Sequence, residues 1–259
     1  WATWRFTTHL FEDKLAALIA VTLATLGMGM VAHIGDYSAH LLSFTFYYLG
    51  ILIIYESGVW HKQQPLKTHL ILGIFLALAS LQYNTGLALA VGYLLVAFWH
   101  NRWWQVGLGA IIALSAQPLW LRFLGVLNGA INEQTGPVNF GVENDVLAKS
   151  LSMWSDAFEQ GYFFQLLLEK ISEFIFFDSP LVVIFGLLAC ALYLYQSKWL
   201  GWFFVVFFSL PLAAGLLYSV ATARGYLIYG VSILLYAVLA GYLARYLRQP
   251  GVSKFIAMS

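Results

Sequence analysis

Long apolar runs separated by short polar segments dominate the sequence. A helix that crosses the hydrocarbon core of a bilayer needs about 20 mostly apolar residues. Six runs approach that length, at residues 15–34, 41–59, 103–121, 181–195, 199–220 and 226–246. The pattern predicts an all-α fold, a polytopic transmembrane helical bundle that forms a single domain over residues 1–259.

A seventh apolar stretch, residues 69–99, is too long for one upright crossing. The polar sequence Gln-Tyr-Asn-Thr-Gly at 82–86 interrupts it midway, which favours two short helices and about eight crossings in all. With the N-terminus inside, nine basic residues fall on the inner side and four on the outer side, as the positive-inside rule requires. We therefore expect an integral protein of the plasma (inner) membrane with both termini cytoplasmic.

The long segment 122–179 is expected on the outer side. Its first part, 125–144, is rich in Gly and Asn and contains Thr135-Gly136-Pro137, which predicts a loop. Apolar residues then recur at helical spacing from Leu147 to Phe174, which predicts an amphipathic helix in the outer interface that bends at Gly161. Gln117-Pro118 should kink or stop the preceding helix.

Small residues predict where helices approach one another closely. Gly73 with Ala77, and Gly107 with Gly109, have the spacing that lets helix backbones come into contact. These positions are expected to carry structure and no chemistry.

Composition narrows the classes of function. The 259 residues are 61% hydrophobic and 10% charged, with a net charge of +1 and no basic cluster, so nucleic acid is not an expected partner. Membrane lipids and other membrane subunits are the expected partners. The single Cys190 excludes an intrachain disulfide. The chain begins at Trp1, so we expect further residues upstream.

The polar island at residues 32–40 is the strongest chemical lead. His33, Asp36 and His40 stand at i, i+3 and i+7, the spacing that places side chains on one face of a helix. Asp36 could act as a general base, bind a divalent metal together with the two histidines, or remain a solvated loop charge. His-x-x-Asp-x-x-x-His is not a distinctive metal signature. Haem ligation by His9, His61, His69 or His100 has no specific support in their spacing.

The predicted topology places further polar residues on the outer side with Asp36. The guanidinium of Arg224 could bind a lipid phosphate or pair with one of the outer acids. Tyr37, Asn84 and Gln117 lie at the same boundary, and we take them as candidates for substrate binding.

Four stretches together resemble the C-type polytopic glycosyltransferases, the superfamily of protein mannosyltransferases and lipid A aminoarabinose transferases. They are the apolar run 10–24, Gly35-Asp36-Tyr37, the run 72–79 leading to Tyr83-Asn84-Thr85-Gly86, and Ala223-Arg224-Gly225-Tyr226-Leu227-Ile228-Tyr229. The resemblance implies transfer of a sugar from a polyprenyl-phosphate carrier on the outer face, with a metal. Asp36 would then stand for the second acidic motif, as the catalytic residue, and Arg224 for a phosphate-binding cation.

One family motif has no counterpart in this chain. The first acidic motif, of the type Asp-x-Asp or Asp-x-Glu, is absent, so either an N-terminal portion is missing or the fold persists without activity. The alternative function is that of a non-catalytic structural subunit of a larger membrane protein complex, with the aromatic residues and the amphipathic helix as docking surfaces.

Overall fold

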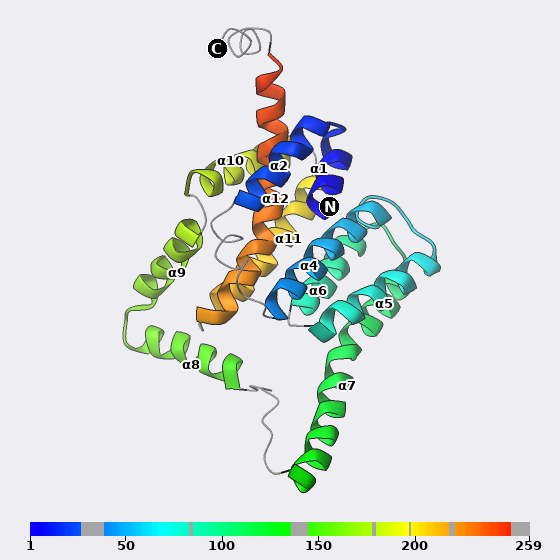
Figure 1. Ribbon diagram of the computed structural model, residues 1–259, viewed down its shortest axis with the longest axis vertical. Helices are drawn as coiled ribbons and strands as arrows, with labels where there is room; N and C mark the ends of the chain where they lie inside the picture. The colour runs from blue at the N-terminus through cyan, green and yellow to red at the C-terminus, as the bar shows by residue number, and fades with distance from the viewer. Residues whose placement is uncertain are drawn as a thin grey trace.

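The computed structural model describes residues 1–26, 39–82, 85–135, 145–177, 180–196, 198–217 and 221–249. These ranges form eleven α-helices (Figure 1). They are α1 (Ala2–Phe11), α2 (Lys14–Leu26), α4 (Ala39–Ser57), α5 (Leu66–Gln82), α6 (Thr85–Ala97), α7 (Trp103–Thr135), α8 (Asp145–Glu159), α9 (Phe163–Phe177), α10 (Pro180–Gln196), α11 (Lys198–Leu217) and α12 (Ala221–Leu247).

The expected bundle of about eight membrane crossings is wrong. Across the described ranges, no helix combines the length and the apolar character that a membrane crossing requires. Within these ranges, α2 has 13 residues and α10 has 17 residues. The prediction of an integral inner-membrane protein with cytoplasmic termini rested on those crossings, and it is corrected with them.

Several helix boundaries also differ from the expected ones. The stretch 69–99 does form two helices, α5 and α6, on either side of the polar break. Helix α7, however, continues past Pro118 as far as Thr135, so the proline does not end the helix and residues 125–135 are not a loop. A proline removes one backbone N–H, and the hydrogen bonds on either side of it can still hold a helix together.

The amphipathic segment forms two helices in place of one bent helix. Helices α8 and α9 are separated at Gly161, whose φ of 78° lies in the left-handed region. A residue in that conformation cannot continue a right-handed helix, and glycine adopts it without strain. The glycine therefore acts as a break and not as a bend.

A tight turn joins α1 to α2. The backbone N–H of Glu12, at φ 53°, donates to the Thr8 carbonyl at 2.7 Å and closes α1. Asp13 then accepts a hydrogen bond from the Leu15 N–H at 2.8 Å, which satisfies one of the open donors at the start of α2. Arg248 Nη2 donates to the same carboxylate at 2.7 Å, and this ion pair connects the end of α12 to the turn.

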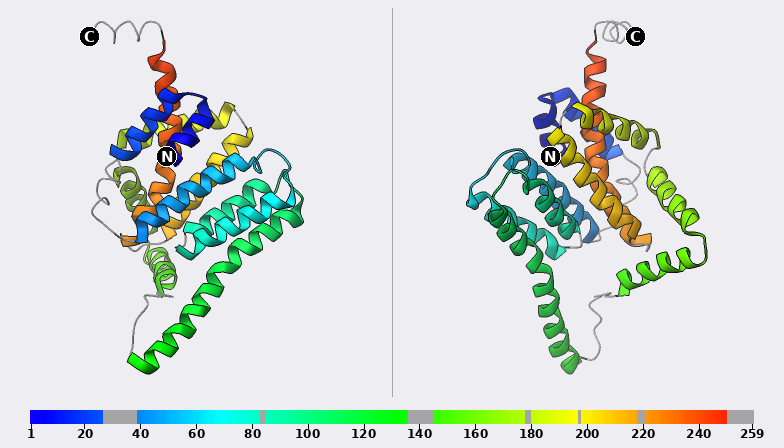
Figure 2. Two further views of the ribbon diagram at one scale, coloured as in Figure 1. Left: turned by 45° about the vertical axis from the view of Figure 1, so that its right-hand side comes forward. Right: turned by 180° about the vertical axis from the view of Figure 1, so that it is seen from behind.

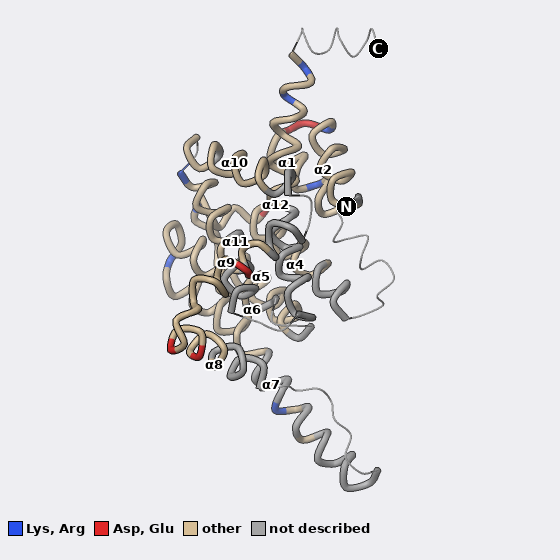
Figure 3. Tube along the Cα trace, turned by 90° about the vertical axis from the view of Figure 1, so that its left-hand side faces the viewer, with Lys and Arg blue, Asp and Glu red and all other residues tan. Residues whose placement is uncertain are grey.

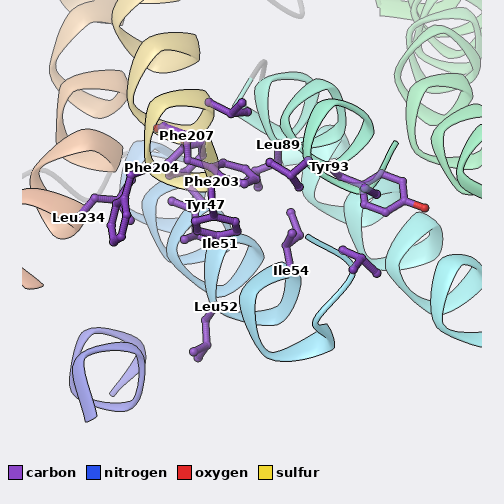
Figure 4. Packing of buried hydrophobic residues seen from close by; sticks show 14 of the residues in the cluster. Tyr47, Ile51, Leu52, Ile54, Leu89, Tyr93, Phe203, Phe204, Phe207 and Leu234 are labelled. Carbon is purple, nitrogen blue, oxygen red and sulfur yellow. The ribbon is translucent and has the colours of Figure 1, made fainter. Parts of the chain in front are cut away.

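Aromatic and aliphatic side chains from four helices form the centre of the core. Phe203, Phe204 and Phe207 project from α11, and the Phe203 and Phe207 rings lie 4.6 Å apart. Figure 4 shows them between side chains of α4, α6 and α12. Those partners include Tyr47, Ile51, Ile54, Leu89, Tyr93 and Leu234.

Helices α5 and α7 approach each other closely at two glycines. A Cβ placed on Gly73 would come within 2.7 Å of the Gly109 carbonyl oxygen. Only glycine leaves room for two helix backbones at that separation. Beyond this contact, the second half of α7 extends away from the other helices (Figure 2).

The contact predicts a position-specific effect of alanine. Gly73→Ala should lower the free energy of unfolding by about 1–3 kcal/mol, because the methyl group must push α5 and α7 apart. Gly107, also on α7, does not lie at the close helix contact expected from the sequence, because open space surrounds the place where the methyl group of an alanine would lie. Gly107→Ala should therefore be neutral or stabilising by up to about 1 kcal/mol. Urea unfolding followed by circular dichroism measures both, and equal effects would contradict the assigned contact.

Candidate functional site

The residues singled out from the sequence lie where the structure gives no side-chain geometry. His33, Asp36, Tyr37 and Asn84 are outside the described residues. His40, Gln117 and Arg224 belong to α4, α7 and α12, whose course is described but whose side chains at these positions are not. The metal site of His33, Asp36 and His40, the catalytic role of Asp36 and the substrate-binding roles therefore stay predictions. Among the residues that are described, no three His, Cys, Asp or Glu side chains gather as metal ligands would.

A hydrogen-bonded group, here called the polar junction, connects α5, α6 and the turns beside them. His69 is fully buried, and its Nδ1 lies 2.7 Å from the Tyr93 hydroxyl. Its Nε2 lies 3.2 Å from Asn101 Oδ1. Asn101 Nδ2 in turn donates to the carbonyls of Val59, at 2.8 Å, and Ala97, at 2.9 Å. One amide thus connects two segments, the turn after α4 and the end of α6, to the histidine.

The partners of Asn101 determine the tautomer of His69. Because Asn101 Nδ2 donates to two carbonyls, its Oδ1 is the atom that faces the imidazole, and an amide oxygen can only accept. His69 Nε2 therefore carries the proton, and Nδ1 accepts from the Tyr93 hydroxyl. Both ring nitrogens are occupied by these hydrogen bonds, which leaves neither for haem iron.

Burial lowers the pKa of His69 below its usual value of 6.5, although the hydrogen bond to Asn101 opposes the change. Desolvation disfavours the charged form of a buried imidazole. The neutral ring is thus the form that the polar junction stabilises. Its role is structural, since both polar atoms of the ring are directed into the protein.

Arg5, His9 and Glu56 also link two helices to each other. Glu56 at the end of α4 accepts hydrogen bonds from Arg5 of α1, with Nη2 to Oε2 at 3.0 Å, and His9 Nε2 lies 3.5 Å from the same carboxylate. Burial raises the pKa of the Cys190 thiol to about 12, so the thiol stays protonated near neutral pH and is a poor nucleophile. Figure 3 shows how few Lys, Arg, Asp and Glu residues there are along the described part of the chain.

Two helices that pack on each other expose regular stripes of large apolar side chains. On α5, the residues Ile71, Ile74 and Leu78 are each more than half exposed. They stand at i, i+3 and i+7 and so share one face of the helix. On α7, Trp104, Leu108 and Ile111 form a similar stripe, with Ile111 at 65% exposure. These six residues are called the α5–α7 face.

The α5–α7 face has no charge of its own. The sequence contains no Asp, Glu, Lys or Arg between 68 and 101, or between 103 and 121. Exposed apolar surface of this kind, without charges inside it, marks a site of interaction with another apolar surface. The described geometry thus supports binding of a partner through this face. In the sequence, the only signal for the face is the pair of hydrophobic runs that predicted membrane crossings.

The polar junction is not among the features that the sequence predicts. Of its three side chains, only His69 is a candidate from the sequence, for its imidazole, and Tyr93 and Asn101 are not. The available signal was the polar Asn101 between two strongly apolar helices, because a polar side chain at such a place usually satisfies backbone groups.

Comparison with known proteins gives no match: no family model fits the chain, and neither a curated protein nor a solved structure is similar to it.

The polar junction predicts that acid destabilises the protein. The pKa of His69 is lower in the folded state than its usual value of 6.5. The unfolded state therefore binds more protons, and the free energy of unfolding should fall as the pH drops through 6.5. Urea unfolding at about pH 7.5 and about pH 5.5, on either side of that value, measures this loss. The variant His69→Gln should show a smaller loss between the two pH values, and an identical loss would contradict the role of His69. His61→Gln should also reduce the loss, because the pKa of His61 is lowered in the same direction.

Proposed function

We propose that this chain is a non-catalytic helical subunit of a larger protein assembly, which it joins through the α5–α7 face. The observation that supports the proposal is the pair of exposed apolar stripes on α5 and α7, centred on Ile74 and Ile111. Covering large apolar side chains of this kind contributes about 25 cal/mol for each Å² removed from water. A partner with a matching apolar surface gains this stabilisation with no need to neutralise a charge.

The internal packing of the two helices makes the face suitable for docking. Gly73 and Gly109 hold α5 and α7 at a fixed close distance, so the stripes belong to a rigid pair and not to separately moving helices. A preformed surface loses little conformational entropy when a partner binds. The polar junction adds to this rigidity, because Tyr93 of α6 bonds to His69 of α5.

The test places a charge on the face of the full chain. The tagged protein, expressed at its native level, should elute in gel filtration at a mass well above the 29.0 kDa of one chain. Ile74→Glu and Ile111→Glu should each shift it to the mass of a single chain, because a carboxylate buried without a partner is strongly unfavourable. The identity of the co-eluting chain, whether a second copy or another protein, follows from mass spectrometry of the complex.

A matched control separates this face from other exposed apolar residues. Leu188 lies with Ile184 and Leu192 in another exposed apolar stripe, on α10, and its 56% exposure is close to the 55% of Ile74. Leu188→Glu should leave the assembly intact. Dissociation by Leu188→Glu as well, or an assembly that tolerates both charges on the α5–α7 face, would contradict the proposal.

An activity assay distinguishes this proposal from the enzymatic prediction. Transfer of sugar from a polyprenyl-phosphate donor by the purified chain, abolished in both Asp36→Asn and Arg224→Ala, would contradict a non-catalytic role. Absence of transfer in the assembled complex agrees with the proposal.

A further inference from the structure

A cavity of about 300 Å³ lies between α1, α2, α4 and α12 and opens to the surface. It lies away from the α5–α7 face and from the polar junction. Apolar atoms dominate its wall, among them those of Ala2, Val21, Ala24 and Leu49. Within the described part of the chain, no charged side chain lines it. Its size is at the lower end of the range for small-molecule sites, which are mostly apolar with a few placed polar groups.

Small side chains on two helices create the space. Ala2 on α1 and Ala24 on α2 contribute a single methyl group each, where longer residues would fill the gap. Trp1 and Tyr48 add aromatic surface to the wall. An apolar ligand of matching size would be removed from water on several sides, which is the condition for a favourable hydrophobic contribution.

The lining includes residues that carry a hydroxyl group, namely Thr3, Thr25, Thr45, Tyr48 and Tyr236. Thr25 lines the cavity, and its Oγ1 donates to the Val21 carbonyl at 2.9 Å. The hydroxyl proton is therefore already used in this hydrogen bond, while the lone pairs of the oxygen can still accept another one. The polar end of a ligand at Thr25 must then be a donor.

Arg5, beside Trp1, gives no binding site for an anionic head group. Arg5 lies with its Cζ 5.2 Å from the centre of the Trp1 ring, at the side of the cavity. Its guanidinium is paired with Glu56, so the charge is already neutralised. The surroundings favour a neutral ligand over a carboxylate or a phosphate.

We propose that the cavity between α1, α2, α4 and α12 binds a small neutral molecule with an apolar body and a hydroxyl donor, of the class of medium-chain alcohols. The alkyl body lies against Val21, Ala24 and Leu49, and the hydroxyl donates to Thr25 Oγ1. This site is separate from the docking role of the α5–α7 face, and either can fail without the other.

The test uses 1-decanol as the probe and titration calorimetry on the full chain. We expect saturable binding of one molecule per chain. Ala24→Phe should reduce the affinity at least tenfold, because the ring fills the cavity. Thr25→Phe provides a second filling variant at an exposed position, and circular dichroism checks that both variants fold.

Two controls make the result specific to the cavity. Leu18→Phe adds a ring on α2 at a position that is 55% exposed and does not line the cavity, and it should bind decanol like the unchanged chain. Thr25→Val keeps the shape but removes the acceptor, and should weaken decanol by about threefold to tenfold while leaving decane unaffected.

The opposite results would overturn the assignment. Absence of saturable binding, unchanged affinity in both filling variants, or an equal loss in Leu18→Phe would each show that the cavity is not the site. Unchanged affinity for decanol in Thr25→Val would overturn the proposed hydroxyl acceptor.

Discussion

The contact between α5 and α7 at Gly73 and Gly109 is the constraint on which much of the described structure depends. Two helix backbones meet where neither residue has a side chain. A Cβ on Gly109 would also come within 2.7 Å of the Tyr93 hydroxyl and 2.8 Å of the His69 carbonyl oxygen. The same close approach therefore positions the polar junction. It also leaves the outward sides of α5 and α7 to carry the exposed apolar stripes.

The apolar core and the buried polar groups contribute to helix packing in different ways. Phe203, Phe204 and Phe207 of α11 supply large buried surfaces that many arrangements of apolar side chains could satisfy. The hydrogen bonds of His69 and Asn101 are directional, and leaving a buried polar atom without its partner costs about 1–3 kcal/mol. We infer that the aromatic core stabilises the bundle, while the polar junction selects one arrangement of α5 and α6 among the possible ones.

Three of the described ionisable side chains hold segments of the fold together, so they already have a structural role. Exposed surfaces are what the fold leaves for function. Asp13, Glu56 and His69 each bridge segments far apart in the sequence. Much of what is left exposed is apolar, and two parts of it differ in shape. The α5–α7 face is an outward surface suited to a protein partner, and the cavity beside Trp1 is a concave surface suited to a small neutral molecule. Both surfaces are apolar, so it is their shape, outward in one case and concave in the other, that distinguishes protein binding from small-molecule binding.

By itself the sequence determined the helical class, the break between α5 and α6, and the close contact at Gly73, because these depend on local periodicity and on side-chain size. It did not determine the extent of α7 beyond Pro118 or the break at Gly161, which depend on backbone conformation at single residues. Hydropathy also overstated the crossings, because an apolar run in the sequence does not fix the length of the helix that it forms. Only the tertiary structure joined Asp13 to Arg248 and Asn101 to Val59, because long-range pairing depends on how helices pack and leaves no local pattern.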